Sequence, residues 1–299
     1  MFILIGIIVV FGSIVAGYLM EHGNLHVLLQ PAELLIIGGA AIGTLLIANP
    51  LHVIKKIAGG VLAALKGSKI NRAFYLESLK MCYELLNKAR KDGLLAIESD
   101  IEEPDKSAIF SRYPKFLTNH HMRDFVCDTL RMAVTGGIDP FDLDQMMDLD
   151  MEVSHRESNA PIAALSTVAD SLPGLGIVAA VLGVVVTMGA LGGPPEEIGH
   201  KVAAALVGTF LGILLCYGLV GPLAANMLKM AEEEHAYVYV IRVILISSVK
   251  GVAPIQALEF GRRAIPANFR PSFNEMEKSL KGGGAAVETP AAAAAEGAA

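Results

Sequence analysis

The sequence ALVGTFLGILLCYGLVGP, from Ala205 to Pro222, carries no charged side chain. A run of this length and polarity is typical of a helix that crosses a lipid bilayer, which takes about 20 residues. Glycines four apart, Gly208 and Gly212, stand in it beside the lone hydroxyl of Thr209. Small residues at this spacing let two helix backbones approach closely in lipid. The segment therefore predicts a membrane helix with one closely packed face.

The rest of the chain shares this apolar character. Of its 299 residues, 53% are hydrophobic and only 18% are charged, with a mean hydropathy of +0.52, which is too apolar for an ordinary soluble protein. The second of its apolar runs is short and can be completed by Pro31–Glu33 or by tilting. We predict an all-α polytopic membrane protein with four transmembrane helices and a helical cytoplasmic domain. The runs, none with Asp, Glu, Lys, Arg or His in its interior, are Met1–Met20, Leu34–Asn49, Leu172–Leu191 and Val202–Met227.

The first run has a second interpretation, as a cleaved signal peptide. A signal peptide carries positive charge before its apolar run and a small-residue cleavage site after it. Met1–Met20 has no Lys or Arg before the apolar run and no clear cleavage site. We therefore interpret it as a retained membrane helix.

The positive charges predict the orientation. No Lys or Arg precedes Lys55, and Lys201 is the only one between Arg156 and Lys229. Short loops poor in Lys and Arg face away from the cytoplasm. We therefore expect the long middle segment, the C-terminal segment and both termini on the cytoplasmic side of the bacterial inner membrane. The predicted outer loops are 21–30 and 192–200.

Glycine and proline divide the middle segment into helices. Gly93 and the pair Gly136–Gly137 are predicted helix stops, whereas Asp139 and Pro140 predict the start of a helix that runs toward the third span. The tail lacks core-forming residues and predicts disorder. The expected parts are transmembrane helices 1 and 2 at 1–50, a cytoplasmic helical domain at 51–170, transmembrane helices 3 and 4 at 171–227, a C-terminal cytoplasmic helical segment at 228–281, and the tail at 282–299.

Two prolines lie near the cytoplasmic ends of the last two spans. Pro173 and Pro222 each remove the hydrogen bond that a helix would give to the carbonyl four residues earlier. Pro173 has two interpretations: it starts a helix, which is common, or it bends a helix that continues through it. For any single pair of small residues, ordinary packing between helices is the simpler interpretation, whereas two parallel rows on both spans favour a closely packed partner shared by the two helices.

The predicted spans contain no ionisable relay, which a chain that moves ions by itself usually carries. Either transport is not the function or a second chain supplies a carboxylate. Thr187 and Thr209 could line an ion path, although such hydroxyls often bond back to their own helix. Asp170 lies at the inner mouth of the third span, where it could equally be a solvated helix end.

Other function classes find little support in the sequence. It shows no nucleophile–base pair, phosphate-binding loop or basic patch with interleaved aromatic residues, so we expect neither an enzyme nor a nucleic-acid-binding protein. The three cysteines lack metal-ligand spacing, and we expect no metal and no cofactor. A solitary secondary transporter is disfavoured by the missing relay and by the lack of inverted broken helices.

The opening segment, taken with several others, resembles the MotA family of flagellar stator subunits. Its pattern of Ala-Leu-x-Gly-Thr-Phe-x-Gly-x-Leu, followed by seven residues and Pro, is matched throughout. DSLPGLGIVAAVLGVV, LQPAELLIIGGAAIG, NKARKDGLLAIESDIE, YPKFLTNHHMRDF, GVAPIQALEFGRR and RPSF also resemble family segments. The likeness covers all of the chain but the tail.

The resemblance implies a function and partners. Five MotA-type subunits would surround two helices of a MotB-type partner, which brings the ion-binding aspartate, and together they would form a proton channel that couples proton flow to torque on the rotor. The alternative to a flagellar stator subunit is a related protein of the ExbB or TolQ type, a proton-driven energiser of outer-membrane processes. A neighbouring gene for a partner with a peptidoglycan-binding domain would favour the flagellar role.

The resemblance also implies roles for particular residues. Arg90 and Glu98 match the charged pair that meets a rotor switch protein of the FliG type, although an ordinary solvated surface would look the same in sequence. Their spacing of eight places them on one helix face only if the helix continues through Gly93. Ala180 and Thr209 match positions that face the partner's aspartate, and Ala180 favours protons over sodium as the coupling ion. Pro173 and Pro222 match the prolines linked to conformational coupling.

Overall fold

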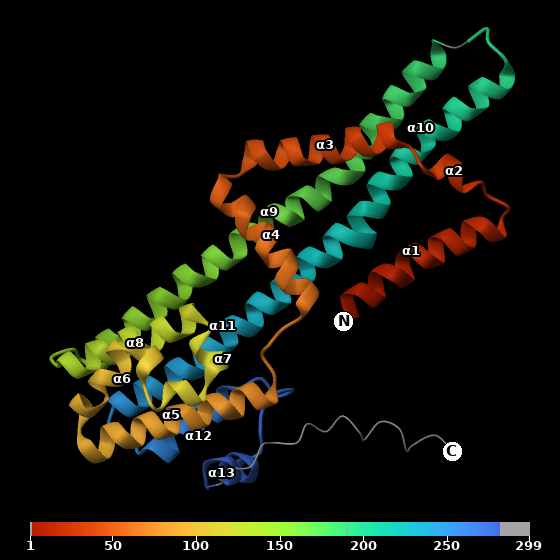
Figure 1. The fold of residues 1–299 in the computed structure, drawn as a ribbon. Coiled ribbons are helices and arrows are strands. Elements are labelled where there is room, and N and C mark those ends of the chain that lie inside the picture. The colour runs from red at the N-terminus through yellow and green to blue at the C-terminus, as the bar shows by residue number, and fades with distance from the viewer. Residues whose placement is uncertain (1, 190, 282–299) are drawn as a thin grey trace, which may run out of the picture. The chain divides into compact units, whose positions relative to one another are not determined.

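The computed structural model describes residues 2–189 and 191–281, and the regular elements within those ranges are all helical (Figure 1). The predicted tail, 282–299, lies outside the described residues. Four helical stretches are long and apolar enough to cross a membrane. The predicted class, an all-α polytopic membrane protein, is confirmed. The chain divides into two compact units: Met1–Ser68 with Ser154–Glu232, and Lys69–Val153 with Glu233–Ala299.

The first unit holds the candidate spans. Its N-terminal elements are α1 (Phe2–Met20), α2 (Leu25–Leu28), α3 (Pro31–Ala48) and α4 (Leu51–Lys66). Three further helices contribute to it, in whole or in part: α9 (Pro140–Met188), α10 (Pro195–Leu215) and α11 (Gly221–Val249). α9 and α11 each continue without interruption into the second unit.

α4 belongs to this first unit although it follows the second span. Its buried residues Val53, Ile57 and Ala64 recur at helical spacing and so form one face. Val53 and Ile57 pack against Ala164 of α9, and Ala64 packs in a cluster with Met227 of α11. The two compact units are defined by packing, whereas the five predicted parts are defined by their position relative to the membrane. The two divisions are therefore not comparable, and the predicted boundaries stay a prediction.

The second unit is built around a core of its own. Tyr237 of α11 is 0% exposed and its hydroxyl lies 2.7 Å from the hydroxyl of Ser78. Its ring lies 5.5 Å from that of Tyr75, between centroids. The helices of this unit are α5 (Arg72–Asp92), α6 (Glu98–Glu102), α7 (Pro114–Leu117), α8 (His120–Thr135), α12 (Pro254–Ala264) and α13 (Phe273–Lys281), with 3₁₀ turns at Leu94–Ile97, Pro104–Lys106 and Phe110–Arg112.

The predicted helix stops and start are confirmed. α5 ends before Gly93 at φ 88°, and α8 ends before Gly136 at φ 77°, a backbone conformation that glycine adopts without strain. At the start of α9, the backbone N–H of Phe141 donates to Oδ1 of Asp139 at 2.8 Å. From there α9 runs to Met188 as one helix. Pro173 therefore lies inside a helix and does not begin one.

Candidate functional site

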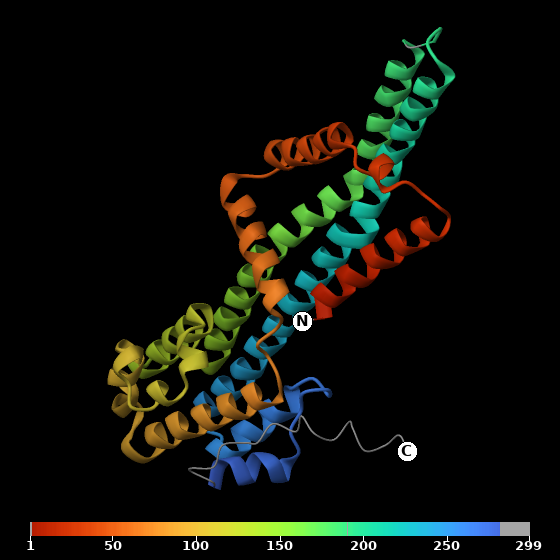
Figure 2. The ribbon, with the colours of Figure 1, turned by 45° about the vertical axis from the view of Figure 1, so that its right-hand side comes forward.

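α9 and α10 lie side by side and their backbones approach closely at several glycines (Figure 1, Figure 2). A methyl group placed on Gly176 would lie 2.8 Å from the backbone oxygen of Gly208, and one on Gly212 would lie 2.5 Å from the oxygen of Leu172. Only glycine leaves room for backbones this close. We call the residues of this contact the α9–α10 seam: Gly176, Ala179, Gly183, Ala205, Gly208 and Gly212.

The seam changes the interpretation of the small residues. From the sequence we expected the two rows to share a closely packed partner, whereas Gly183 faces Ala205 and Gly176 faces Gly212 within one chain. The rows therefore pack against each other. Apolar side chains on the other faces, such as Val185 and Leu206, are exposed and available to lipid or to other chains.

Ala180 and Thr209 each adjoin a seam residue, Ala179 on α9 and Gly208 on α10. The backbone nitrogen of Ala180 lies 3.2 Å from a methyl group placed on Gly208, and Thr209 is the next residue along α10. Both side chains are half-buried. The structure thus places Ala180 at the contact between α9 and α10, and Thr209 next to Gly208 of the same contact.

Thr187 and Asp170 lie elsewhere on α9. Thr187 is buried and its hydroxyl donates to the backbone oxygen of Gly183 at 2.8 Å, so the hydrogen-bond donor of this side chain is used within its own helix. Asp170 is exposed and ten residues from Ala180, which is about 15 Å along a helix. The structure does not bring these two side chains to the contact beside Ala180 and Thr209.

The two predicted prolines have different surroundings. Pro173 is half-buried inside α9, which holds a further proline, Pro161, that the sequence prediction passed over. Pro222 is exposed and follows a π-helical turn, Cys216–Val220. In this turn the N–H of Gly221 bonds to the oxygen of Cys216, five residues earlier. The missing N–H of Pro222 thus falls where the bonding register changes, and the helix continues to Val249 instead of ending at the proline.

Glu33 corrects the expectation that the spans carry no ionisable group. α3 begins at Pro31, so Glu33 lies in its first turn within a candidate span. Its side chain is 6% exposed, and its Oε2 is buried without a hydrogen-bond partner. The carboxyl reaches the seam, because Oε2 lies 2.8 Å from a methyl group placed on Gly208. In the sequence Glu33 stands at the edge of an apolar run, where an acid normally remains solvated.

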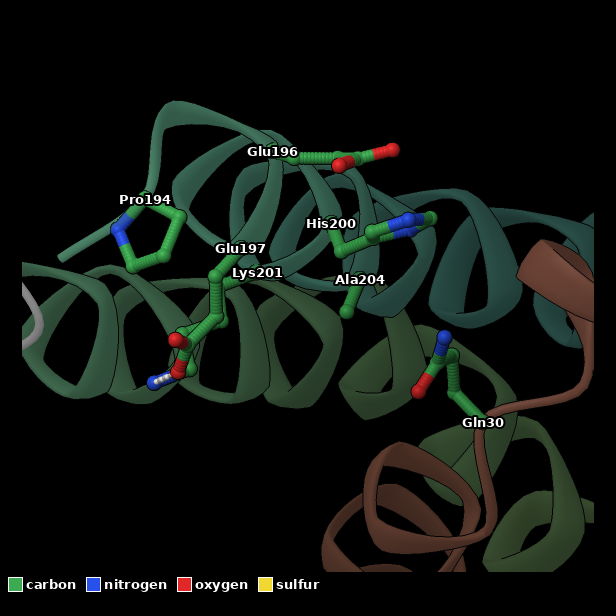
Figure 3. A pocket seen from close by; sticks show the side chains of 7 residues that line it. All are labelled: Gln30, Pro194, Glu196, Glu197, His200, Lys201 and Ala204. Atoms are coloured by element: carbon green, nitrogen blue, oxygen red, sulfur yellow. Dashed lines mark ion pairs between the residues drawn. The ribbon is translucent and has the colours of Figure 1, made fainter.

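A pocket of about 590 Å³ opens at the N-terminal ends of α3 and α10. Gln30 and Ala204 face it from opposite helices, and the Lys201 Nζ pairs with Oε1 of Glu197 at 2.9 Å beside it (Figure 3). His200, also in the lining, is exposed. The pocket thus gathers polar groups one helical turn from the contact of Glu33 with the seam.

Arg90 and Glu98 do not share a helix. Arg90 lies in the last turn of α5 and Glu98 begins α6, with Gly93 and a 3₁₀ turn between them. Both side chains are exposed, and neither forms an ion pair within residues 2–189 and 191–281. The side chains of Leu94 and Leu95, between them, are 48% and 71% exposed. These four residues form a surface of two charges and two leucines.

A buried ion pair fixes the base of this surface. The Nζ of Lys88 lies 2.7 Å from Oδ2 of Asp100, which is 4% exposed. The hydroxyl of Ser107 donates to Oδ1 of Asp100 at 2.6 Å and accepts the backbone N–H of Ile109 at 3.1 Å. Since Lys88 precedes Arg90 by two residues and Asp100 follows Glu98 by two, this network sets their separation. Asp100 is therefore a buried acid within a segment whose neighbouring charges are exposed.

The two cysteines of the second unit are structural thiols. Burial raises the pKa of Cys82 and of Cys127 to about 12, so both stay protonated at neutral pH. Within the described residues, no group of three or more His, Cys, Asp or Glu side chains is arranged to hold a metal ion.

The chain is similar to known motility proteins. A family model described as "Motility protein A N-terminal" matches residues 4–93, and one described as "MotA/TolQ/ExbB proton channel family" matches residues 117–238. Motility protein A of Escherichia coli is 41% identical over 290 residues, which cover 97% of this chain and 97% of that protein. Motility protein A of Salmonella typhimurium is 40% identical over 94% of this chain and 95% of its own.

Two solved structures share the fold. The flagellar MotAB stator complex from Bacillus subtilis contains a chain that superposes with a TM-score of 0.72 at 28% identity, covering 89% of this chain and 96% of that one. A chain of the C. jejuni MotAB structure superposes with a TM-score of 0.75 over 91% and 98%, and at 20% identity it supports the fold alone. The chain therefore belongs to the motility protein A family of flagellar stator proteins, within the MotA/TolQ/ExbB proton channel proteins.

Proposed function

We propose that the chain assembles with a MotB-type partner into a proton channel that couples proton flow to torque on the flagellar rotor. The observation that carries this proposal is the closely packed α9–α10 seam, which Ala180 and Thr209 adjoin on its two helices. A partner helix laid beside this seam would bring its aspartate near these two positions. The complexes that the related structures are named for, MotAB, support a partner of this kind.

The energetics favour a neutralised carrier. A bare charge in the bilayer costs several kcal/mol, whereas a proton that falls through 100 mV releases about 2.3 kcal/mol. Passage therefore requires a carboxylate that is protonated at each step. An energy of this size suits small sliding or rotation of helices packed through glycine and alanine. In this proposal the helices bend at Pro173 and Pro222.

The assembly that we propose has five copies of this chain around two partner helices. The exposed apolar residues of α9 and α10 supply faces for neighbouring copies and for lipid. Both termini and the second unit face the cytoplasm, because the basic residues concentrate there. The coupling ion is the proton and no resident cofactor takes part.

The second unit supplies the contact with the rotor. Arg90 and Glu98 are exposed and unpaired among the described residues, and they flank two exposed leucines. Charges left without partners are free to pair with opposite charges on a FliG-type switch protein. The buried Lys88–Asp100 pair holds them at a fixed separation.

The test is rotation of tethered cells of a strain that lacks its own stator and expresses this chain with its partner. We expect rotation whose speed follows the proton gradient and stays constant when potassium replaces sodium at fixed pH and voltage. Ala180 offers no oxygen to a dehydrated sodium ion, which needs several oxygen ligands. Speed that collapses without sodium would contradict the proton assignment, and cells that never rotate would favour the ExbB or TolQ type.

A further inference from the structure

No hydrogen bond at the α9–α10 seam compensates for the burial of the Glu33 Oε2 atom. The side chain of Glu33 is 6% exposed and its Oε2 has no hydrogen-bond partner. An ionised carboxylate buried without a partner costs several kcal/mol, and a proton on it removes that cost. A side chain of this kind is suited to binding and releasing protons.

The groups that face Glu33 are small and uncharged. A methyl group on Gly208 would lie 2.8 Å from Oε2 of Glu33, 3.2 Å from Cβ of Ala179 and 3.2 Å from the nitrogen of Ala180. The carboxyl therefore occupies the space that the missing side chain of Gly208 leaves free, between α9 and α10. Within the described residues, Oε2 of Glu33 has no hydrogen-bond partner, titratable or not, and Thr209 follows Gly208 along α10.

The pocket at the helix ends is lined by residues that lie close to this carboxyl along the chain. Gln30 lines the pocket and precedes Glu33 by three residues on α3, while Ala204 lines it and precedes Gly208 by four on α10. Both steps are about one helical turn, or roughly 5.4 Å. Along each helix, the pocket lining therefore lies about one turn from the contact between Glu33 and Gly208, on the side of the predicted outer loops.

An acid in the first turn of a helix is common, because it stabilises the positive end of the helix dipole. Capping, in addition, needs a carboxylate oxygen that accepts one of the first N–H groups of the helix. Oε2 of Glu33 accepts none of these N–H groups. Gln30, the residue at the N-cap of α3, does not cap the helix either, because its side-chain amide donates to the backbone oxygen of Val27 at 3.1 Å. Helix capping therefore does not account for Glu33.

We propose that Glu33 is a proton-binding group of this chain, loaded from water in the pocket at the outer ends of α3 and α10. On loading, a hydronium ion gives its proton to the carboxylate, an O–H bond forms and water remains. On release, the proton passes toward the seam beside Ala180 and Thr209, to water or to a carboxylate of the partner helix. This inference rests on the proposed function, since it adds an entry site to the same proton path.

The direct test is infrared spectroscopy of the full chain in complex with its partner in lipid nanodiscs. We expect the C=O stretch of a protonated carboxylic acid, which shifts in D₂O, and we expect Glu33→Gln to remove part of this band. The matched control is Glu21→Gln, which changes an exposed acid of the outer loop and should leave the band unchanged. A band that survives intact in Glu33→Gln, or its absence from the wild type, would overturn the proposal.

A second readout separates proton delivery from packing. Stall torque depends on the energy of each proton, whereas speed at low load depends on how fast protons arrive. We therefore expect Glu33→Gln to lower low-load speed several-fold with stall torque unchanged, and Glu33→Asp to restore part of the speed. Equal loss at both loads would assign Glu33 to structure and overturn the proposal. A wild-type chain that supports no rotation would instead contradict the proposed function, independently of the infrared result.

Discussion

Gly176 and Gly174 offer a matched test of the α9–α10 seam. A methyl group on Gly176 would lie 2.8 Å from the backbone oxygen of Gly208, whereas one on Gly174 would meet nothing within 4 Å. A carbon and an oxygen in contact lie about 3.3 Å apart or more, so Gly176→Ala has to separate the helices by about 0.5 Å. The obstructing atom belongs to the backbone, and no change of rotamer relieves the clash.

The expected loss of stability follows from comparing Gly176→Ala with Gly174→Ala. Both substitutions gain the helix propensity of alanine, about 1 kcal/mol in a soluble helix, so this gain cancels in the comparison. Overpacking costs about 1–3 kcal/mol. We therefore expect Gly176→Ala to be less stable than Gly174→Ala by about that amount, as measured by unfolding the reconstituted protein in mixed micelles. We also expect slower swimming for Gly176→Ala at equal membrane levels. Equal stability and equal swimming in the two variants would refute the seam.

Three further predictions concern the second unit. Reversing both charges, with Arg90→Glu and Glu98→Lys, should cut torque in tethered cells while the amount of chain in the membrane stays constant; loss of membrane assembly would make these residues structural. Asp100→Asn leaves a lysine without its carboxylate, and since that lysine is 35% exposed and can turn to water, we expect a loss of about 1–3 kcal/mol in thermal unfolding; an unchanged melting temperature would contradict the network. Hydrogen bonds from Arg262 hold the pKa of Glu259 at about 2, below its ordinary 4.5. This depressed pKa stabilises the fold above about pH 4.5, and the stability is lost as pH falls toward 2; Glu259→Gln should flatten that part of the stability profile.

The sequence predicts what depends on neighbours along the chain. The four spans, the stops at Gly93 and Gly136 and the start of α9 at Asp139 follow from local apolarity, backbone freedom and capping, and the structure confirms them. Local pattern predicted that the helix from Pro140 would run toward the third span, but it left open whether Pro173 starts a new helix, and the structure shows one helix to Met188. These features need no knowledge of which helix packs against which.

What the sequence leaves open depends on packing between distant segments. The burial of Glu33 requires α3 to reach Gly208 of α10, and no local pattern specifies that contact. Periodicity showed that small residues form faces, but it could not tell a face turned to the same chain from one turned to a partner. The Lys88–Asp100 pair spans a helix break, where the spacing rules of a single helix do not apply.

The π-helical turn at Cys216–Val220 sets the rotational phase between α10 and α11. A π turn inserts about one extra residue, and each residue of an α-helix advances the helix by about 100°. The face that carries Gly208 and Gly212 on α10 is therefore rotated by roughly a quarter turn when its pattern is extended into α11. Deleting one residue within this turn would bring α10 and α11 onto one continuous α-helical register. The deletion would leave the sequence of α11 unchanged, yet it would rotate every side chain of α11 away from its present neighbours.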